Sequence, residues 1–315
     1  MAVQIVLLII GFILLIKGAD IFVDGASNLA RNFKMSKMLV GLTIVAFGTS
    51  APEFAVSIKS ILSGSGEIVL GNVVGSNILN ILLILGVSSL IHFLRVKDTT
   101  VKKEIPLVLL MTLLLVVLMC DGMFDDKIIN QLTRTDGLVI LLFFSVFIYH
   151  LFSMMRNKTD DDSNDLIWKL PKSIVFTILG IISIILGSNL VVDSATSIAS
   201  EIGVSERIIA LTIVALGTSL PELVTSVMAT KKGEYDIAIG NIVGSNLFNI
   251  GVVLGIPILL FGTVDIGTFN NFDLIMLILS TLALYIFAKN DYKISKREGI
   301  VFLLMFVIYY SIVLI

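Results

Sequence analysis

The sequence predicts an all-α membrane protein with ten transmembrane helices in two inverted five-helix repeats. Three observations lead to this fold class: 57% of the 315 residues are hydrophobic, the mean hydropathy is +1.03, and the chain repeats itself at an offset of 169 residues. Ordinary soluble domains are far less apolar. Five prolines and 24 glycines suit helical spans with a few weak points, whereas a membrane barrel would show short alternating segments.

A membrane-spanning helix needs about 20 mostly apolar residues. On this basis we place spans at residues 3–29, 37–62, 68–93, 104–121, 136–154, 172–198, 206–230, 236–262, 271–288 and 298–315. No small-residue cleavage site follows the first apolar run. We therefore expect that run to remain in the chain as a span.

Lysines and arginines concentrate in alternate connections between these spans. The connections carry Arg31, Lys34, Lys37, Arg95, Lys97, Lys102, Lys103, Arg156, Lys158, Lys169, Lys172, Lys231, Lys232, Lys289, Lys293, Lys296 and Arg297. The positive-inside rule places this side in the cytoplasm. We expect a multi-pass protein in the lipid bilayer of the cell membrane, with both termini extracellular.

A polar run, TDDDSND, separates the two halves of the chain. It lacks the ligand spacing of an EF-hand calcium loop, so we interpret residues 156–171 as a cytoplasmic linker. The first five-helix repeat then covers residues 1–155 and the second covers residues 172–315.

The internal repeat is densest in two motif regions, residues 42–81 and 211–250. The segments LTIVAFGTSAPE (42–53) and LTIVALGTSLPE (211–222) agree at ten of twelve positions, and GNVVGSNILNI (71–81) and GNIVGSNLFNI (240–250) agree at eight of eleven. An odd number of spans in each half means that the second copy enters the membrane from the opposite side. Inverted repeats are typical of secondary transporters, whose substrate site lies near the midplane where the repeats meet.

The first repeated motif puts a proline inside an apolar span. Pro52 and Pro221 lack an amide hydrogen and crowd the carbonyl four residues back, so we expect the helices to loosen around Gly48 and Gly217. Freed carbonyls at membrane depth are tolerated where they line a cavity or meet a ligand. Further oxygen atoms come from Thr49, Ser50, Glu53, Thr218, Ser219 and Glu222. A set made only of oxygen favours Ca²⁺ or Na⁺ over zinc or copper.

The second motif forms a stripe of polar residues along one helix face. In the first half the stripe is Asn72, Ser76 and Asn80, and in the second half it is Asn241, Ser245 and Asn249. Gly71, Gly75, Gly240 and Gly244 are expected to let a neighbouring helix approach. Asn77 and Asn246 fit a packing role and a role in a polar network equally well.

Glu53 and Glu222 are the most informative residues. Placing an ionisable side chain near the bilayer centre costs at least ~2.5 kcal/mol, so a functional role is favoured over protonated packing residues. Together the two carboxylates carry a charge of −2, which one Ca²⁺ or two or more monovalent ions would neutralise. Mutually exclusive occupancy of this kind predicts exchange, because an empty charged pair in a dry site is penalised.

The patterns GTS-x-PE and GN-x-x-GSN-x-x-N resemble those of the Ca²⁺/cation antiporter superfamily, particularly prokaryotic members of its sodium/calcium exchanger branch. The resemblance implies a central cluster of Na⁺ and Ca²⁺ sites in a ten-helix inverted-repeat fold. Glu53 and Glu222 would be the main ligands, with the carbonyls of Thr49 and Thr218 beside them. Flanking Na⁺ sites would use Ser50, Ser76, Ser219 and Ser245 and the carbonyls of Ala46 and Ala215, and Asn80 and Asn249 would line the middle.

Two further expectations follow from this resemblance. Potassium-dependent members carry an aspartate where this chain has Asn249, so transport is expected to be independent of K⁺. The first and sixth helices of such proteins slide past the ligand core to alternate access. In the matching helices here, Asp24 and Asp193 are expected to be interfacial caps or gate-edge groups, and Lys17 and Asp20 a local pair.

The leading functional hypothesis is electrogenic Na⁺/Ca²⁺ exchange by alternating access. An H⁺/Ca²⁺ antiporter that uses the same two glutamates is the first alternative, and a cation channel is the second. The sequence has no HExxH, no nucleophile with a matching histidine and no phosphate-binding loop, so we expect no enzyme activity and no cofactor. Ca²⁺, Na⁺ and lipid are the expected partners, without nucleic acid, and the oligomeric state stays open, a monomer included.

Overall fold

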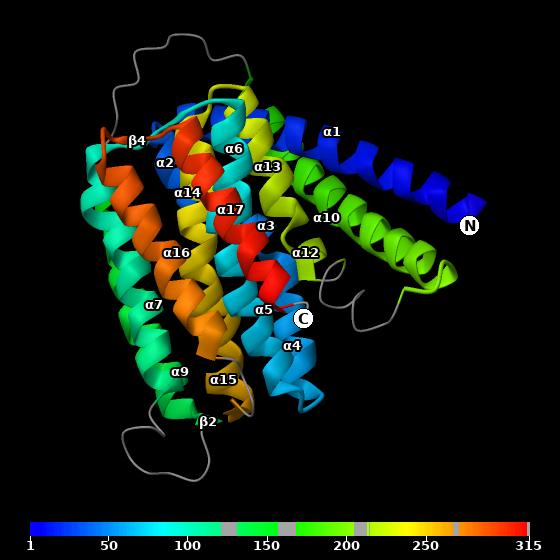
Figure 1. Ribbon diagram of the computed structural model, residues 1–315. Helices are drawn as coiled ribbons and strands as arrows, with labels where there is room; N and C mark the ends of the chain where they lie inside the picture. Colours follow the sequence, from blue (N-terminus) through cyan, green and yellow to red (C-terminus); the bar gives the residue numbers. More distant parts are fainter. Residues whose placement is uncertain (121–130, 157–167, 205–212, 214, 267–270, 314–315) are drawn as a thin grey trace.

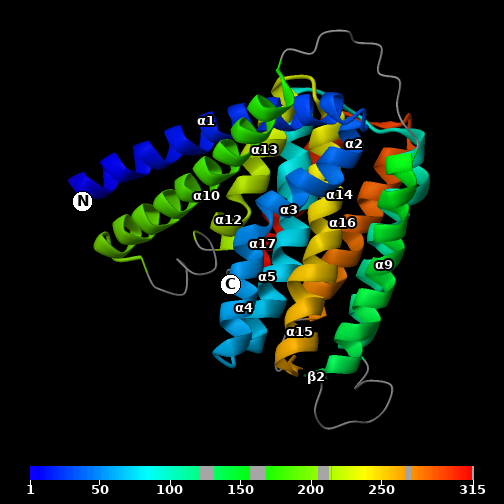
Figure 2. The same cartoon turned by 180° about the vertical axis from the view of Figure 1, so that it is seen from behind.

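The computed structural model describes residues 1–120, 131–156, 168–204, 213, 215–266 and 271–313, which form a bundle of helices (Figure 1). Two long helices, α1 (Ala2–Asn32) and α10 (Leu170–Glu201), pack against each other along their length. In both views this pair leans away from the remaining helices (Figures 1 and 2). The molecule is therefore built from an upright bundle and a slanted helix pair at its side.

The first half of the upright bundle contains three continuous helical runs in which α-helix and π-helix follow each other without a break. Its elements are α2 (Lys37–Val40), the π-helical η1 (Gly41–Val45), α3 (Ala46–Thr49), α4 (Ala51–Leu62), α5 (Gly66–Leu79), the π-helical η2 (Asn80–Leu85), α6 (Gly86–Ile91), β1 (Leu94–Arg95), the π-helical η3 (Thr100–Glu104), α7 (Ile105–Met119), β2 (Gln131–Leu132) and α9 (Arg134–Arg156).

The second half follows the same order. Its elements are α12 (Ala215–Thr218), α13 (Leu220–Lys231), α14 (Tyr235–Phe248), the π-helical η5 (Asn249–Leu254), α15 (Gly255–Phe261), β3 (Val264–Asp265), α16 (Asn271–Lys289), β4 (Lys293–Ile294) and α17 (Lys296–Val313). The elements α3, α4, α5 and η2 reappear as α12, α13, α14 and η5 with both bounds shifted by the 169 residues of the sequence repeat. The repeat in the sequence is thus a repeat in local structure.

Helical structure occurs at each predicted span, although the described residues support fewer spans by length and composition. Six helices are long and apolar enough to cross a membrane, and a seventh candidate is the bent run Lys37–Leu62. Helices such as α7 and α13, with 15 and 12 residues, are shorter than a full span. Part of the predicted span 206–230 and residues 157–167 of the predicted linker lie outside the described residues.

Two short antiparallel sheets connect the halves. Strand β1 pairs with β4, matching Leu94 with Ile294, and β2 pairs with β3, matching Leu132 with Val264. Strands β4 and β2 lie at opposite ends of the bundle in Figure 1. Each sheet therefore joins one strand from each half, at opposite ends of the molecule.

The GTS-x-PE motif breaks the helix, as its proline predicts. The segments Lys37–Thr49 and Ala51–Leu62 meet at an angle of 45°, and the break falls at Ser50, two residues after Gly48. In the second half Ser219 occupies the same place between α12 and α13, with nearly the same backbone angles as Ser50. Both prolines lie in the first turn of the following helix, where a missing amide hydrogen is tolerated.

Large apolar side chains remain exposed on the outer helices. Val3 on α1, Leu142 on α9, Leu186 on α10 and Leu304 on α17 are each more than half exposed. Apolar exposure spread over so many helices is unusual for a soluble monomer. It fits a surface that contacts lipid.

Helix α1 is tied to the second half by a lysine. The Nζ atom of Lys232 lies 2.8 Å from Oδ1 of Asp20 and 2.6 Å from Oδ1 of Asp24, and it also donates to the Asp20 carbonyl at 2.7 Å. The predicted Lys17–Asp20 pair is wrong, because Asp20 takes this more distant partner. Spacing along one helix could not reveal an ion pair to a residue more than 200 positions away.

Close contact between α1 and α10 depends on glycine. A Cβ atom added at Gly180 would lie 2.7 Å from the backbone of Phe22, and one at Gly187 would lie 2.7 Å from the amide nitrogen of Leu15. Distances this short mean that any side chain must push the helices apart. The contact also explains how two antiparallel helices of 31 and 32 residues stay together with few polar bonds between them.

Replacing Gly180 by valine should destabilise the helix pair. We expect Gly180→Val to lower the free energy of unfolding by about 1–3 kcal/mol, because the added methyl groups overpack a closed interface. The midpoint of thermal unfolding in detergent measures the change. Leu179→Val is the matched control, since Leu179 is exposed on the same turn. Equal midpoints for the two variants would contradict the proposed packing.

Candidate ion-binding site

Two buried carboxylates from different halves lie at the centre of the bundle. Glu53 is in the first turn of α4 and Glu222 is in the first turn of α13, and their exposed fractions are 1% and 0%. The Glu53 carboxylate lies within electrostatic range of Glu222. The repeat therefore brings together two acidic groups that are 169 positions apart in the sequence.

Side chains of the first motif bond directly to the second motif. The Ser50 hydroxyl donates to Oε1 of Glu222 at 2.9 Å, and the Thr49 hydroxyl lies 3.0 Å from Oδ1 of Asn241. All four residues are buried. These contacts make one polar cluster from both halves.

Asn72 and Asn241 brace the carboxylate helices. Nδ2 of Asn72 donates to the Glu53 carbonyl at 3.0 Å and to Ser57 at 3.1 Å. Nδ2 of Asn241 donates to Ser226 at 2.9 Å and lies 3.4 Å from the Glu222 carbonyl. The two asparagines were predicted as part of a polar stripe, and the structure shows which groups they hold.

Ser57 and Ser226 are site-supporting residues that the sequence analysis did not single out. Each lies four residues after a motif glutamate, and the two positions are related by the repeat offset. A polar residue at a repeated position one turn from the glutamate was the available signal.

Several oxygen atoms of the cluster have no hydrogen-bond partner among the described residues. They are both carboxylate oxygens of Glu53, Oε2 of Glu222, the hydroxyls of Ser219 and Ser245, and Oδ1 of Asn80 and of Asn249. Buried polar atoms in proteins are normally paired, so a group of unpaired oxygens in one place indicates a site for a ligand. Hard cations bind oxygen atoms of these kinds. The arrangement is suited to hold them.

The remaining predicted site residues surround this cluster. Ala46 begins α3, and its carbonyl accepts from the Ser50 amide at 3.0 Å. Ser76 is buried on α5 and donates to the Asn72 carbonyl at 2.6 Å. In the second half, Ala215 begins α12 and Thr218 ends it.

Asn80 and Asn249 are the first residues of η2 and η5. Wide π-helical turns that interrupt α-helices are frequent at functional sites. The repeat places such a turn beside the cluster in each half, which the sequence pattern alone did not reveal.

A cavity of about 370 Å³ borders the two helix breaks. Pro52 on α4, Asp193 and Asn189 on α10, and Gly217 and Thr218 on α12 are among its lining residues. The Ser188 hydroxyl donates to the Gly217 carbonyl at 2.9 Å. Pro221 cannot donate to that carbonyl, so α10 satisfies it instead. Ala19 stands at the equivalent position of α1 and has no hydroxyl.

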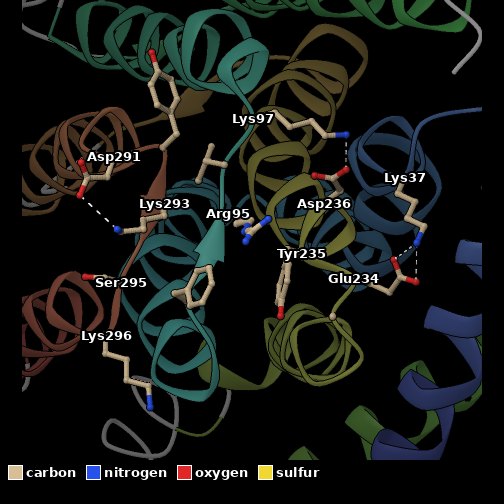
Figure 3. Close-up of a pocket in the computed structure, with 14 residues that line it drawn as sticks. Lys37, Arg95, Lys97, Glu234, Tyr235, Asp236, Asp291, Lys293, Ser295 and Lys296 are labelled. Carbon is tan, nitrogen blue, oxygen red and sulfur yellow. Dashed lines mark hydrogen bonds and ion pairs between the residues drawn. The ribbon is translucent and has the colours of Figure 1, made fainter. Parts of the chain in front are cut away.

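A larger pocket of about 920 Å³ lies away from the carboxylates. Figure 3 shows Lys37 paired with Glu234 and Lys97 paired with Asp236, with N···O distances of 2.7 and 2.6 Å. Basic residues outnumber acidic ones in its lining. The lining therefore carries a net positive charge. Its charge agrees with the cytoplasmic side that the positive-inside rule assigns.

The glycines of the second motif behave as predicted where their surroundings are described. A Cβ atom at Gly240 would lie 2.9 Å from the Met38 carbonyl, and one at Gly244 would lie 2.7 Å from Cβ of Ala46. The repeat places the corresponding neighbours of Gly71 and Gly75 at residues 207–215. Most of that segment lies outside the described residues.

Fold and site together define a class of protein: a multi-pass helical membrane protein with buried oxygen groups gathered between two repeated motifs. The family model described as sodium/calcium exchanger protein matches residues 3–153 and 172–315. The chain therefore belongs to this family, a family of transporters within the Ca²⁺/cation antiporter superfamily. This confirms the predicted family and the expectation of a transporter in place of an enzyme.

Individual relatives match along nearly the whole chain. CaxA of Alkalimonas amylolytica is 38% identical, with 98% of each chain covered, and the sodium/calcium exchanger MaX1 of Methanosarcina acetivorans is 31% identical, with 99% of this chain and 98% of MaX1 covered. A structure of the sodium-calcium exchanger NCX_Mj, soaked with 2.5 mM Na⁺ and 0.1 mM Ca²⁺, is similar with a TM-score of 0.82 and 33% identity, covering 98% of each chain. The similarity therefore extends along nearly the full length of each pair of chains.

The two bracing asparagines should differ in their effect on stability. Asn241 is fully buried, so Asn241→Leu should lower the free energy of unfolding by about 1–3 kcal/mol through the unpaired groups left behind. Asn72→Leu should cost less, because Asn72 is only partly buried. Thermal unfolding of the two variants in the same detergent measures the difference, and a larger loss for Asn72→Leu would contradict the assignment.

Proposed function

We propose that the chain is a secondary active antiporter that exchanges Na⁺ for Ca²⁺ by alternating access, without a need for K⁺. The observation that carries the proposal is the pair of buried glutamates from the two halves, three of whose four carboxylate oxygens lack a protein partner among the described residues. Unpaired carboxylates at this depth are costly unless a cation joins them. The names of MaX1 and NCX_Mj as sodium/calcium exchangers support the choice of ions.

The proposed ligands are those of the polar cluster. Glu53 and Glu222 would bind Ca²⁺ and Na⁺ directly, and the others would complete Na⁺ sites or line the middle: Thr49, Thr218, Ser50, Ser219, Ser76, Ser245, Asn80, Asn249, Ala46 and Ala215. The Asn249 side chain is neutral, which keeps the carboxylate count of the cluster at two. One Ca²⁺ would balance that charge, and two or more Na⁺ would take its place.

The ten-helix inverted repeat belongs to the same proposal. Identical offsets of the helix bounds support two structural copies, residues 1–155 and 172–315 joined by the linker 156–171. Placement of the two sheets at opposite ends supports an inverted relation between them. Both termini would then be extracellular, with α1 and α10 as the pair that moves past the cluster.

Proton coupling is the competing function, because a carboxylate without a donor is also what a proton carrier needs. Both oxygens of Glu53 meet that description among the described residues. A channel is the remaining alternative. The three differ in which gradient drives calcium and in whether a counter-ion is required.

Calcium uptake into proteoliposomes tests the proposal. An outward Na⁺ gradient should drive ⁴⁵Ca²⁺ uptake, and uptake should fall at least about 30-fold in Glu53→Gln and in Glu222→Gln, since removing one charge from a buried charged set costs about 2 kcal/mol or more. Glu67→Gln, on an exposed residue, should transport normally. Uptake driven by a pH gradient without Na⁺ would establish proton coupling, and uptake that needs no counter-ion would establish a channel.

The Lys232 contacts should restrain α1. Lys232→Gln removes ion pairs to two half-exposed aspartates, each worth up to about 1 kcal/mol. Amide hydrogen exchange in residues 18–28 should then accelerate about fivefold. Lys231→Gln is the adjacent control, because Lys231 is exposed and takes no part in these ion pairs. Unchanged exchange in the Lys232 variant would show that these pairs do not hold the helix.

A further inference from the structure

Three buried asparagines form a chain of hydrogen bonds whose direction is fixed. Nδ2 of Asn77 on α5 donates to the backbone carbonyl of Asn246 on α14 at 3.3 Å. Nδ2 of Asn249 on η5 donates to Oδ1 of Asn77 at 3.1 Å. All three side chains are at most 1% exposed. The chain links the two halves of the molecule beside the carboxylates.

The backbone carbonyl sets the order of the amides. A carbonyl only accepts, so Asn77 must turn its nitrogen toward Asn246 and its oxygen toward Asn249. Asn249 must then use its own nitrogen on Asn77. Its Oδ1 is left buried and without a partner among the described residues. Helix element η5, which Asn249 begins, packs against α4, the helix that carries Glu53.

The same residues in the other half are arranged differently. By the repeat, Asn246 corresponds to Asn77 and Asn80 corresponds to Asn249. Nδ2 of Asn246 donates within its own helix to the Ile242 carbonyl at 3.1 Å, and its Oδ1 has no partner among the described residues. Neither amide atom of Asn80 has a hydrogen-bond partner among the described residues. Equivalent sequence positions therefore hold one amide in a fixed orientation and leave the other without a restraint from the described residues.

We propose that Asn77 is a positioning residue that keeps the amide of Asn249 turned with its oxygen toward the cation cluster. Asn80 has no such restraint and turns its amide according to which ion is bound. The inference rests on the proposed function, because it assigns Asn249 a place beside the transported ions. Asn77 lies outside the proposed ligand set, and the inference makes it control the orientation of one ligand, Asn249.

The chemistry follows from the two ends of an amide. The oxygen attracts a cation, whereas the NH₂ group repels it and donates readily to a carboxylate. If Asn249 turned over, its nitrogen would bond to a glutamate and compete with the cation for the same oxygens. Asn77 prevents this by giving the nitrogen a better-placed acceptor.

Equilibrium binding of ⁴⁵Ca²⁺ to the purified full-length protein tests the inference, with Na⁺ as competitor. Asn77→Leu keeps the shape of the side chain and removes the acceptor, and it should weaken Ca²⁺ binding about tenfold, the equivalent of one lost hydrogen bond to a functional group. Asn246→Leu is the matched control from the other half and should change binding less than about twofold, because its amide donates only within its own helix. Equal losses in the two variants would overturn the assignment.

A second background separates positioning from a structural role. An aspartate at position 249 has oxygen at both ends, so its orientation no longer matters. In Asn249→Asp protein, adding Asn77→Leu should change Ca²⁺ binding less than about twofold, whereas a merely structural role would cost the same tenfold in both backgrounds. A loss of Ca²⁺ affinity of about tenfold on adding Asn77→Leu to Asn249→Asp protein would overturn the inference.

A conservative variant covers the case in which Asn77→Leu fails to fold. Asn77→Asp still offers an oxygen to Nδ2 of Asn249, so the Ca²⁺ affinity should stay at or above that of the wild type. A loss of Ca²⁺ affinity of about tenfold, as expected for Asn77→Leu, would overturn the inference. Wild-type protein that binds Ca²⁺ without competition from Na⁺ would instead contradict the proposed exchange. The role of Asn77 is judged from Ca²⁺ affinity alone, whereas the proposed exchange is judged from competition by Na⁺. Failure of one can therefore be told from failure of the other.

Discussion

The rest of this structure depends on one constraint. Two carboxylates in the interior of a membrane protein cannot remain charged without a partner of opposite charge. Glu53 and Glu222 are buried by helices from both halves, and three of their four carboxylate oxygens have no donor among the described residues. The free-energy penalty for such groups is large unless positive charge accompanies them. In the proposed exchanger, bound cations would therefore also stabilise the folded protein.

The backbone around the glutamates responds to the same constraint. Each glutamate lies in the first turn of a helix that begins after a break, where the positive end of the helix dipole favours an ionised carboxylate. The breaks at Ser50 and Ser219 also place a hydroxyl at the end of each preceding helix, and Ser50 bonds across to Glu222. A helix passing straight through the membrane would offer neither feature. The proline in each motif is thus responsible for the local geometry of the site.

The two halves are not fully symmetric, and they differ in their contacts with α1 and α10. Ser188 satisfies the Gly217 carbonyl, while the equivalent position on α1 is Ala19. Lys232 anchors α1, whereas its counterpart in the first half is Ser63. In the proposed exchanger, unequal contacts of this kind would give the two states of access different energies.

Sequence reasoning predicted the helical class, the positions of the main helical segments, the broken helices and the buried glutamates, because each follows from local composition or from the repeat. It missed the bracing serines, the π-helical turns at Asn80 and Asn249, and the direction of the asparagine chain. It paired Asp20 with the wrong lysine. These features depend on how helices distant in sequence pack together, and neither spacing nor composition records that packing.

The central claim is that the two glutamates share one cation, and anomalous diffraction from crystals of the protein soaked in Ca²⁺ or Sr²⁺ tests it most directly. The account predicts a single strong peak between the carboxylates of Glu53 and Glu222 that disappears when Na⁺ replaces the divalent ion. A peak on one carboxylate alone, or one that Na⁺ leaves in place, would contradict it.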